Sequence, residues 1–190
     1  MKSLQYCALL RGINVGGGNL IKMASLKSCL ESAGIENVAT YIQSGNVLFE
    51  SPESDEAKLA RRLEKILSET FKPYSARVVV CAQDRLRKIV MGAPKGFGRK
   101  PETYRYDVIY LMDGLTPATA IKRVLTRPGV DEARTGPGVL YFSRLIVRAS
   151  QSRLTRIIGL PIYQQMTIRN WNTTTRLLAL MQARGKGIGD

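Results

Sequence analysis

The sequence predicts an α+β protein made of two ferredoxin-like halves, each with the element order β-α-β-β-α-β, followed by a C-terminal helix. Two observations carry this prediction. Short apolar or β-branched runs alternate with longer amphipathic segments, and the series occurs twice, on either side of a basic stretch rich in glycine and proline. The expected organisation is a first half at residues 1–82, a helix and linker at 83–102, and a second half with the final helix at 103–190.

The first half contains the clearest signals. The apolar run at residues 4–10 predicts a buried strand, and a glycine-rich loop at residues 11–19 follows it. Ser44 and Gly45 lie between two β-branched and aromatic runs, which is typical of a β-hairpin. Charged and apolar residues segregate to opposite sides of the segment 54–71, which indicates an amphipathic helix. The other elements expected here are a helix at residues 23–32 and strands at residues 38–43, 46–50 and 77–81.

The second half follows a predicted helix at residues 84–91 and the basic linker at residues 92–101. Its first run, residues 104–112, alternates tyrosines with other residues and predicts a strand. The later elements expected are a helix at 116–125, strands at 130–134 and 139–142, a helix at 152–158, a short strand at 166–168 and a final helix from residue 170 to about residue 183.

The absence of histidine limits the chemistry. It excludes Ser-His-Asp and Cys-His catalysis and every imidazole metal ligand. Cys7, Cys29 and Cys81 are widely spaced, so they predict small buried residues in a reduced, cytoplasmic protein and not a disulfide framework. The carboxylates show no spacing typical of a metal site, and no cofactor is expected. No segment has the length and apolar character of a membrane span or a signal peptide.

Three segments together resemble a known family. They read LLRGINVGG at residues 9–17, TYIQSGNV at residues 40–47 and TIRNWNT at residues 167–173. In order and spacing they are similar to domain of unknown function 1697, an uncharacterised and mostly bacterial family. The resemblance implies a paired ferredoxin-like architecture, and it implies no activity because the function of the family is not established.

The topology of the first half predicts a polar site. The loop after the first strand and the turn between the second and third strands fall at the same end of the sheet, so Arg11 and Asn14 should lie near Ser44. These groups could form a pocket for an anionic ligand, which the glycine loop and the helix start would also favour. Alternatively, they satisfy one another and the loop backbone. The candidate ligand-binding residues are Arg11, Asn14, Gly16, Gly17, Lys22, Gln43, Ser44, Asn46, Arg169 and Asn170.

Two features of the second half could also contact a ligand. Asn170 is expected to cap the last helix, with an anion site beside Arg169 as the alternative. Tyr104, Tyr106 and Tyr110 share one strand face, with Tyr141 or Phe142 on the neighbouring strand. Aromatic residues on the helix-free face of such a sheet stack bases in RNA-recognition domains, whereas burial where the two halves meet is the alternative that the pattern favours.

The charge is distributed unevenly. Residues 1–82 carry 10 basic and 8 acidic groups, whereas residues 83–190 carry 19 and 7, so the second part holds +12 of the net +14. Such a field attracts polyanions. The motifs that carry the family resemblance lie mainly in the nearly neutral first half, apart from this charge. From the charge, the glycine loop and the tyrosine strand together we expect a non-enzymatic binder of an anionic, phosphate-bearing ligand such as a nucleotide or a nucleic acid. The alternatives are a small-molecule enzyme with a histidine-free polar pocket and a protein-interaction domain, and the sequence leaves the oligomeric state open.

Overall fold

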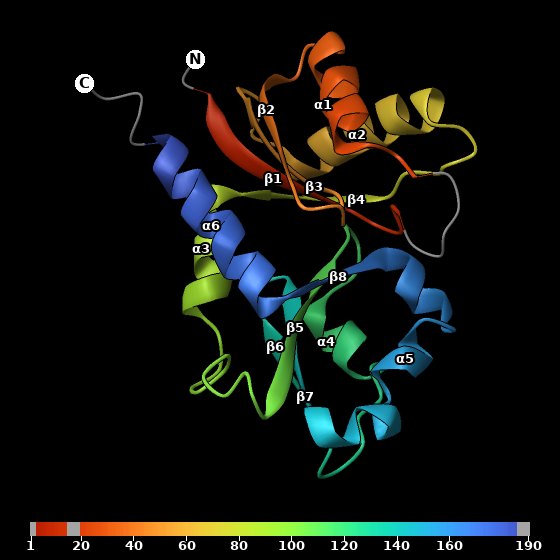
Figure 1. Cartoon of the computed structure of the whole chain (residues 1–190), viewed down its shortest axis with the longest axis vertical. Helices are drawn as coiled ribbons and strands as arrows, with labels where there is room; N and C mark the ends of the chain where they lie inside the picture. Colours follow the sequence, from red (N-terminus) through yellow and green to blue (C-terminus); the bar gives the residue numbers. More distant parts are fainter. Residues whose placement is uncertain (1–2, 15–19, 186–190) are drawn as a thin grey trace. The chain divides into compact units, whose positions relative to one another are not determined.

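The computed structural model describes residues 3–14 and 20–185, which fall into two compact units (Figure 1). The first unit contains the described residues up to 86 together with those from 176 onward, and the second contains residues 87–175. Each unit has one four-stranded sheet. All strand pairs are antiparallel in both sheets, and each sheet carries helices, which confirms the predicted α+β class with two ferredoxin-like halves.

The first unit has the strand order β2-β3-β1-β4. The two central strands, β1 and β3, pair with Leu9 opposite Asn46. The helices α1 and α2 lie against one face of this sheet (Figure 1). The elements of this part of the chain are β1 (Leu4–Leu10), α1 (Met23–Ser32), β2 (Glu36–Tyr41), β3 (Asn46–Ser51), α2 (Glu56–Thr70), β4 (Val78–Ala82) and α3 (Gln83–Met91), of which α3 continues into the second unit.

Side-chain alternation along β1 explains the core of the first unit. Tyr6, Ala8 and Leu10 point to the helical side, where they join Leu26 of α1 and Leu63 of α2 in one buried cluster. Every second side chain of the strand therefore faces the apolar sides of the two amphipathic helices. Contact between them removes apolar surface of the strand and of the helices from water.

The second unit has the strand order β6-β7-β5-β8. Its helical side buries Ile109, Leu140 and Phe142 against residues of α4 and α5. The elements are β5 (Tyr104–Leu111), α4 (Pro117–Ile121), β6 (Asp131–Gly136), β7 (Val139–Leu145), the 3₁₀ segment η1 (Ile146–Gln151), α5 (Leu154–Ile157), η2 (Pro161–Gln165), β8 (Met166–Asn170) and α6 (Trp171–Gly185), of which α6 continues into the first unit.

Several boundaries differ from the sequence-based expectation. The helix predicted at residues 116–125 ends at Ile121, and turns follow it in which the backbone nitrogens of Arg123 and Val124 both donate to the carbonyl oxygen of Ala120. The strand predicted at residues 139–142 continues to Leu145, and η1 follows it directly. The predicted division placed the whole final helix in the second half, whereas its residues from Arg176 onward group with the first unit.

Candidate functional site

The structure brings Asn14, in the glycine loop after β1, to the turn between β2 and β3. The amide nitrogen of Asn14 donates to the carbonyl oxygens of Ile21, at 3.0 Å, and Gln43, at 3.1 Å. The amide oxygen of Asn14 accepts from the backbone nitrogen of Ile21 at 2.8 Å. Asn14 and Gln43 therefore lie close together, as predicted. The Asn14 side chain joins the loop to Ile21, shortly before α1, and to Gln43 in the hairpin.

Asn46 has a comparable role inside the hairpin. Its side chain is fully buried. Its amide nitrogen donates to the carbonyl oxygen of Tyr41 at 2.9 Å and to the hydroxyl of Ser44 at 3.0 Å. Gly45 accepts a hydrogen bond from the backbone nitrogen of Leu10 at 2.8 Å, which fixes the turn to β1. These polar groups thus hydrogen-bond to one another and to the backbone of the turn, which is the alternative to ligand binding that the sequence left open.

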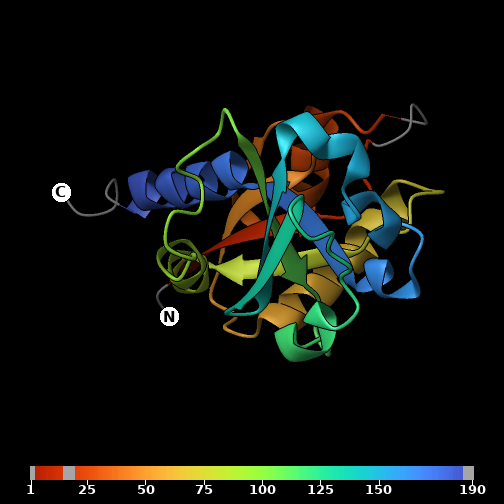
Figure 2. The ribbon, with the colours of Figure 1, turned by 90° about the horizontal axis from the view of Figure 1, so that it is seen from below.

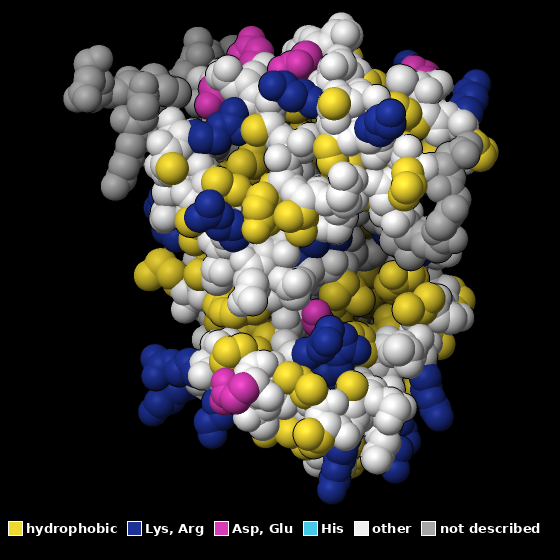
Figure 3. Space-filling model, in the orientation of Figure 1, with side chains coloured by type: hydrophobic (Ala, Val, Ile, Leu, Met, Phe, Trp, Pro, Cys, Tyr) yellow, Lys and Arg dark blue, Asp and Glu magenta, His cyan; other side chains and the backbone are white. Residues whose placement is uncertain are grey.

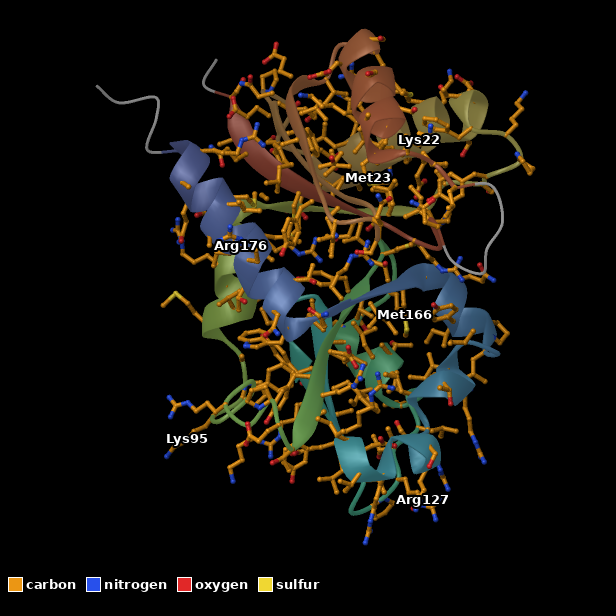
Figure 4. All side chains as sticks on the ribbon, viewed as in Figure 1. Lys22, Met23, Lys95, Arg127, Met166 and Arg176 are labelled. Atoms are coloured by element: carbon orange, nitrogen blue, oxygen red, sulfur yellow. The ribbon has the colours of Figure 1, made fainter. Side chains whose placement is uncertain are left out.

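The cationic residues of the predicted site lie at its edges. Arg11 is half-buried at the end of β1, where its carbonyl oxygen accepts from the hydroxyl of Tyr74 at 2.9 Å. Lys22 is exposed and immediately precedes α1 (Figure 4). Gly16 and Gly17 lie outside the described residues. Binding of an anion at this end of the first unit stays a prediction.

Arg169 and Asn170 support the backbone at the β8–α6 junction. The amide oxygen of Asn170 accepts from the backbone nitrogen of Thr173 at 2.7 Å, which confirms the predicted cap. Arg169 is buried, and its guanidinium donates to the hydroxyl of Thr167 at 2.9 Å and to the carbonyl oxygen of Ile168 at 2.8 Å. An anion site beside Arg169 is not needed to account for these contacts.

A pocket of about 520 Å³ lies within the second unit. Its floor is the face of the sheet opposite α4 and α5. On this face Tyr106 pairs with Ser143, which in turn pairs with Glu132, so the three side chains form one row across β5, β7 and β6. The next row contains Tyr141, opposite Arg134. Strand register therefore resolves the alternative left by the sequence, because Tyr141 and not Phe142 shares the face of the tyrosines.

The loop between α3 and β5 forms the wall of the pocket. Figures 1 and 2 show this loop on one side of the second sheet and α4 and α5 on the other. Phe97, in the middle of the loop, contacts three aromatic rings edge-on, with ring centroids 4.8 Å from Tyr106, 5.3 Å from Tyr141 and 5.2 Å from Trp171. A side chain on Gly98 would lie 2.3 Å from the indole nitrogen of Trp171, so only glycine fits beside Phe97.

Tyr141 anchors the start of this loop. Its hydroxyl donates to the carbonyl oxygen of Ile89, near the end of α3, at 2.5 Å. Burial raises the pKa of Tyr141 to about 12, so the phenol stays protonated and remains a donor at any ordinary pH. Its ring also lies against Gly136, where an added Cβ would come within 2.3 Å of the ring.

Three cationic side chains line the same pocket. Lys95 and Lys100 come from the loop and Arg134 comes from β6, and all three are exposed. The guanidinium of Arg134 pairs with Glu132, with Nη2 at 2.6 Å and Nε at 2.7 Å from Oε1. Figure 3 shows Lys and Arg side chains projecting from the edge of the second unit, and Figure 4 shows Lys95 extending outward from the loop.

Sequence reasoning found part of this pocket and missed the rest. It identified Tyr104 and Tyr106 as sharing a face, and both line the pocket and are partly exposed. It treated residues 92–101 only as a linker, although Phe97 is an aromatic residue in a basic loop next to a tyrosine-rich strand. That combination is the signal that could have added Phe97, Lys95 and Lys100 to the candidate residues.

Two of the three cysteines are buried as predicted, whereas Cys29 on α1 is only half-buried, with its Sγ 3.4 Å from the hydroxyl oxygen of Thr70. Cys7 and Cys81 are buried and lie opposite each other on β1 and β4. A hydrogen bond to Cys7 and burial raise the pKa of Cys81, which keeps this thiol protonated. Among residues 3–14 and 20–185, no group of three or more cysteine, aspartate or glutamate side chains could hold a metal ion. Within the same ranges no helix has the length and apolar character needed to span a membrane.

Comparisons with known proteins agree with this architecture. Over 95% of its length the chain is similar to the structure of the conserved bacterial protein SP0830 from Streptococcus pneumoniae, with 25% sequence identity, a TM-score of 0.81 and coverage of 99% of that chain. No curated protein matches the chain. Residues 4–141 match the model of the protein family of unknown function DUF1697. The three motifs and the matched region together show that the chain belongs to the DUF1697 family.

Proposed function

We propose that this protein is a non-enzymatic binder of a nucleotide or a nucleic acid, and that the ligand occupies the aromatic and basic pocket of the second unit. One observation carries the proposal. Three aromatic residues, Phe97, Tyr104 and Tyr106, line the same pocket as the two lysines Lys95 and Lys100.

These two kinds of side chain match the two parts of a nucleotide. Stacking of a base on an aromatic ring contributes about 1–3 kcal/mol, and it tolerates any base because every base has a π-face. Lysines beside the rings neutralise phosphates and release the counterions condensed on them. The volume of about 520 Å³ lies in the range of small-molecule and cofactor sites.

The predicted polar site of the first unit supports ligand binding less well. The amides of Asn14 and Asn46 already hold the glycine loop and the hairpin in place. A ligand that recruited these amides would first have to displace hydrogen bonds to the partly exposed backbone of Ile21, Tyr41 and Gln43, each of which contributes about 0.5–1.5 kcal/mol net. The rings of Phe97 and Tyr106 can contact a base through their faces and edges, which form no hydrogen bonds that the base would have to displace.

Tyrosine substitutions test the proposal. Fluorescence anisotropy of a labelled octathymidine should report binding by the wild-type protein. Y106A should weaken this binding by about 5- to 150-fold, which corresponds to the loss of one stacked base. Y106F keeps the ring and should retain the wild-type affinity. Equal affinities for wild type and Y106A, with both folded by circular dichroism, would remove the proposal.

Competition distinguishes the two ligand sources. If thymidine monophosphate displaces the labelled octamer at about the same nucleotide concentration as unlabelled octathymidine does, the site is a mononucleotide pocket. Displacement only by longer oligonucleotides would indicate a single-strand binding surface that extends beyond the pocket. Inorganic phosphate serves as the control, because it shares the anion but cannot stack.

A further inference from the structure

We propose that Glu132 makes the pocket selective for guanine. This inference rests on the proposed function, because it names the base that the pocket would accept. A carboxylate is unexpected in a site for a polyanion, since it repels phosphate. Glu132 nevertheless lines the pocket together with three cationic residues, and its position on the sheet explains what it could contact.

The strand register places Glu132 in line with Tyr106. Tyr106 on β5 pairs with Ser143 on β7, and Ser143 pairs with Glu132 on β6, so all three point to the same face of the sheet. Adjacent strands lie about 4.8 Å apart, which puts the Glu132 backbone about 10 Å from that of Tyr106. A purine stacked on the Tyr106 ring would therefore direct its edge along the row, over Ser143 and toward the Glu132 carboxylate.

The Glu132 carboxylate is held by Arg134 through one of its two oxygens, and the other oxygen can still accept hydrogen bonds. Both contacts from Arg134 fall on Oε1 of Glu132, at 2.6 Å and 2.7 Å. Within the described parts of the chain, Oε2 takes part in no hydrogen bond or ion pair. Arg134 thus fixes the orientation of the side chain and leaves acceptor capacity on it, because a carboxylate provides about four lone-pair sites.

Guanine is the base that fits such an acceptor. Its pairing edge carries the N1–H and the N2 amino group side by side, so both donors can reach one carboxylate. Adenine and cytosine each present one amino group next to an acceptor nitrogen, and thymine flanks its N–H with two carbonyl oxygens. Those acceptors would face the negative charge of Glu132, so the carboxylate both attracts guanine and disfavours the other bases.

A single-base comparison tests this inference. The probes are labelled octathymidines in which one central thymine is replaced by guanine or by inosine, which lacks only the N2 amino group of guanine. The wild-type protein should bind the guanine probe about 10-fold more tightly than the inosine probe, as expected for one hydrogen bond to a charged group. E132Q should bring this ratio close to one and should strengthen binding of octathymidine, because the negative charge that repels phosphate and faces the carbonyl oxygens of thymine is removed.

E102Q is the matched control. Glu102 follows the same loop and is exposed, it does not line the pocket, and its substitution removes the same charge. This variant should keep the wild-type preference for guanine over inosine. Equal binding of the two probes by the wild type, or an unchanged ratio in E132Q, overturns the selectivity while octathymidine binding still upholds the proposed function. Absence of binding to every probe overturns both.

Discussion

The ring of Phe97 meets the ring of Tyr106 edge-on, with the centroids 4.8 Å apart and the planes inclined at 65°. This contact joins a loop rich in glycine and proline to a strand of the second sheet. Because Phe97 also touches Tyr141 and Trp171, one loop residue brings four aromatic rings together. The loop that carries Lys95 and Lys100 is consequently held over the sheet, and the pocket exists because of it.

Removal of the Phe97 ring should release this loop. F97A should increase the rate at which trypsin cleaves the native protein after Lys95 and Arg99, because the loop loses its apolar attachment to the sheet. F97L should show a smaller increase, since it keeps part of the buried area. The cleavage sites can be followed by mass spectrometry over time. Identical cleavage rates in wild type and F97A would mean that other contacts hold the loop.

Two glycines of the first unit should respond very differently to alanine. Gly12 and Gly45 both have positive φ, at 66° and 72°. A Cβ at Gly12 meets nothing within 4 Å, whereas a Cβ at Gly45 would lie 2.3 Å from Cγ2 of Ile13. G12A should therefore cost only the backbone strain of about 1–2 kcal/mol. G45A should lower the free energy of unfolding by a further 1–3 kcal/mol or so, as overpacking does. Urea denaturation measures both, and equal losses would contradict the packing of the hairpin against Ile13.

Asp107 should make stability depend on pH. Its carboxylate is buried on β5, with Oδ2 3.5 Å from Nη2 of Arg144. Burial raises the pKa of Asp107 above 3.8, although Arg144 and Arg105 oppose this effect. The folded state therefore binds this proton more tightly than the unfolded chain. The stabilisation from protonated Asp107 is complete below its unfolded pKa and is lost as the pH rises through the folded pKa.

D107N isolates this effect, because the amide does not titrate and the other groups of the protein are unchanged. Between about pH 4 and about pH 7 the wild type should lose the stabilisation from protonated Asp107, whereas D107N should not. The free energy of unfolding of D107N minus that of the wild type should therefore increase over this interval, whether the difference is positive or negative at pH 4. Urea denaturation at several pH values gives this difference. A difference that decreases over the same interval would show that the ion pair with Arg144 outweighs the cost of burial.

Much of the fold was predictable because it depends on local periodicity. The apolar run of β1, the hairpin around Ser44 and the amphipathic α2 each have a pattern that identifies them without tertiary information. The short helix α4 was predicted too long, because its end depends on the turns that follow it rather than on composition alone. The grouping of α6 residues with the first unit depends on long-range packing, which no local pattern encodes.

For the candidate sites, too, local sequence patterns predicted which residues lie near one another but not the contacts that they make. Topology alone brought Asn14 to Gln43, but only the hydrogen bonds show that the Asn14 amide holds backbone carbonyls. Alternation along β5 predicted that Tyr104 and Tyr106 share a face, whereas the choice between Tyr141 and Phe142 required the register of β7. The position of Phe97 over this face could not be predicted, because loop conformation depends on contacts such as that of Gly98 with Trp171.

The salt dependence of oligonucleotide binding shows whether the lysines of the pocket contact phosphates. For the wild type, the logarithm of the octathymidine binding constant should fall linearly with the logarithm of the salt concentration, by about 0.7 per neutralised phosphate. K95Q/K100Q should reduce this slope by about 1.4, because two phosphate contacts are lost. K122Q/R123Q removes two exposed charges of the second unit that do not line the pocket, and it should leave the slope unchanged. The same slope in the wild type and K95Q/K100Q would contradict phosphate binding at this pocket.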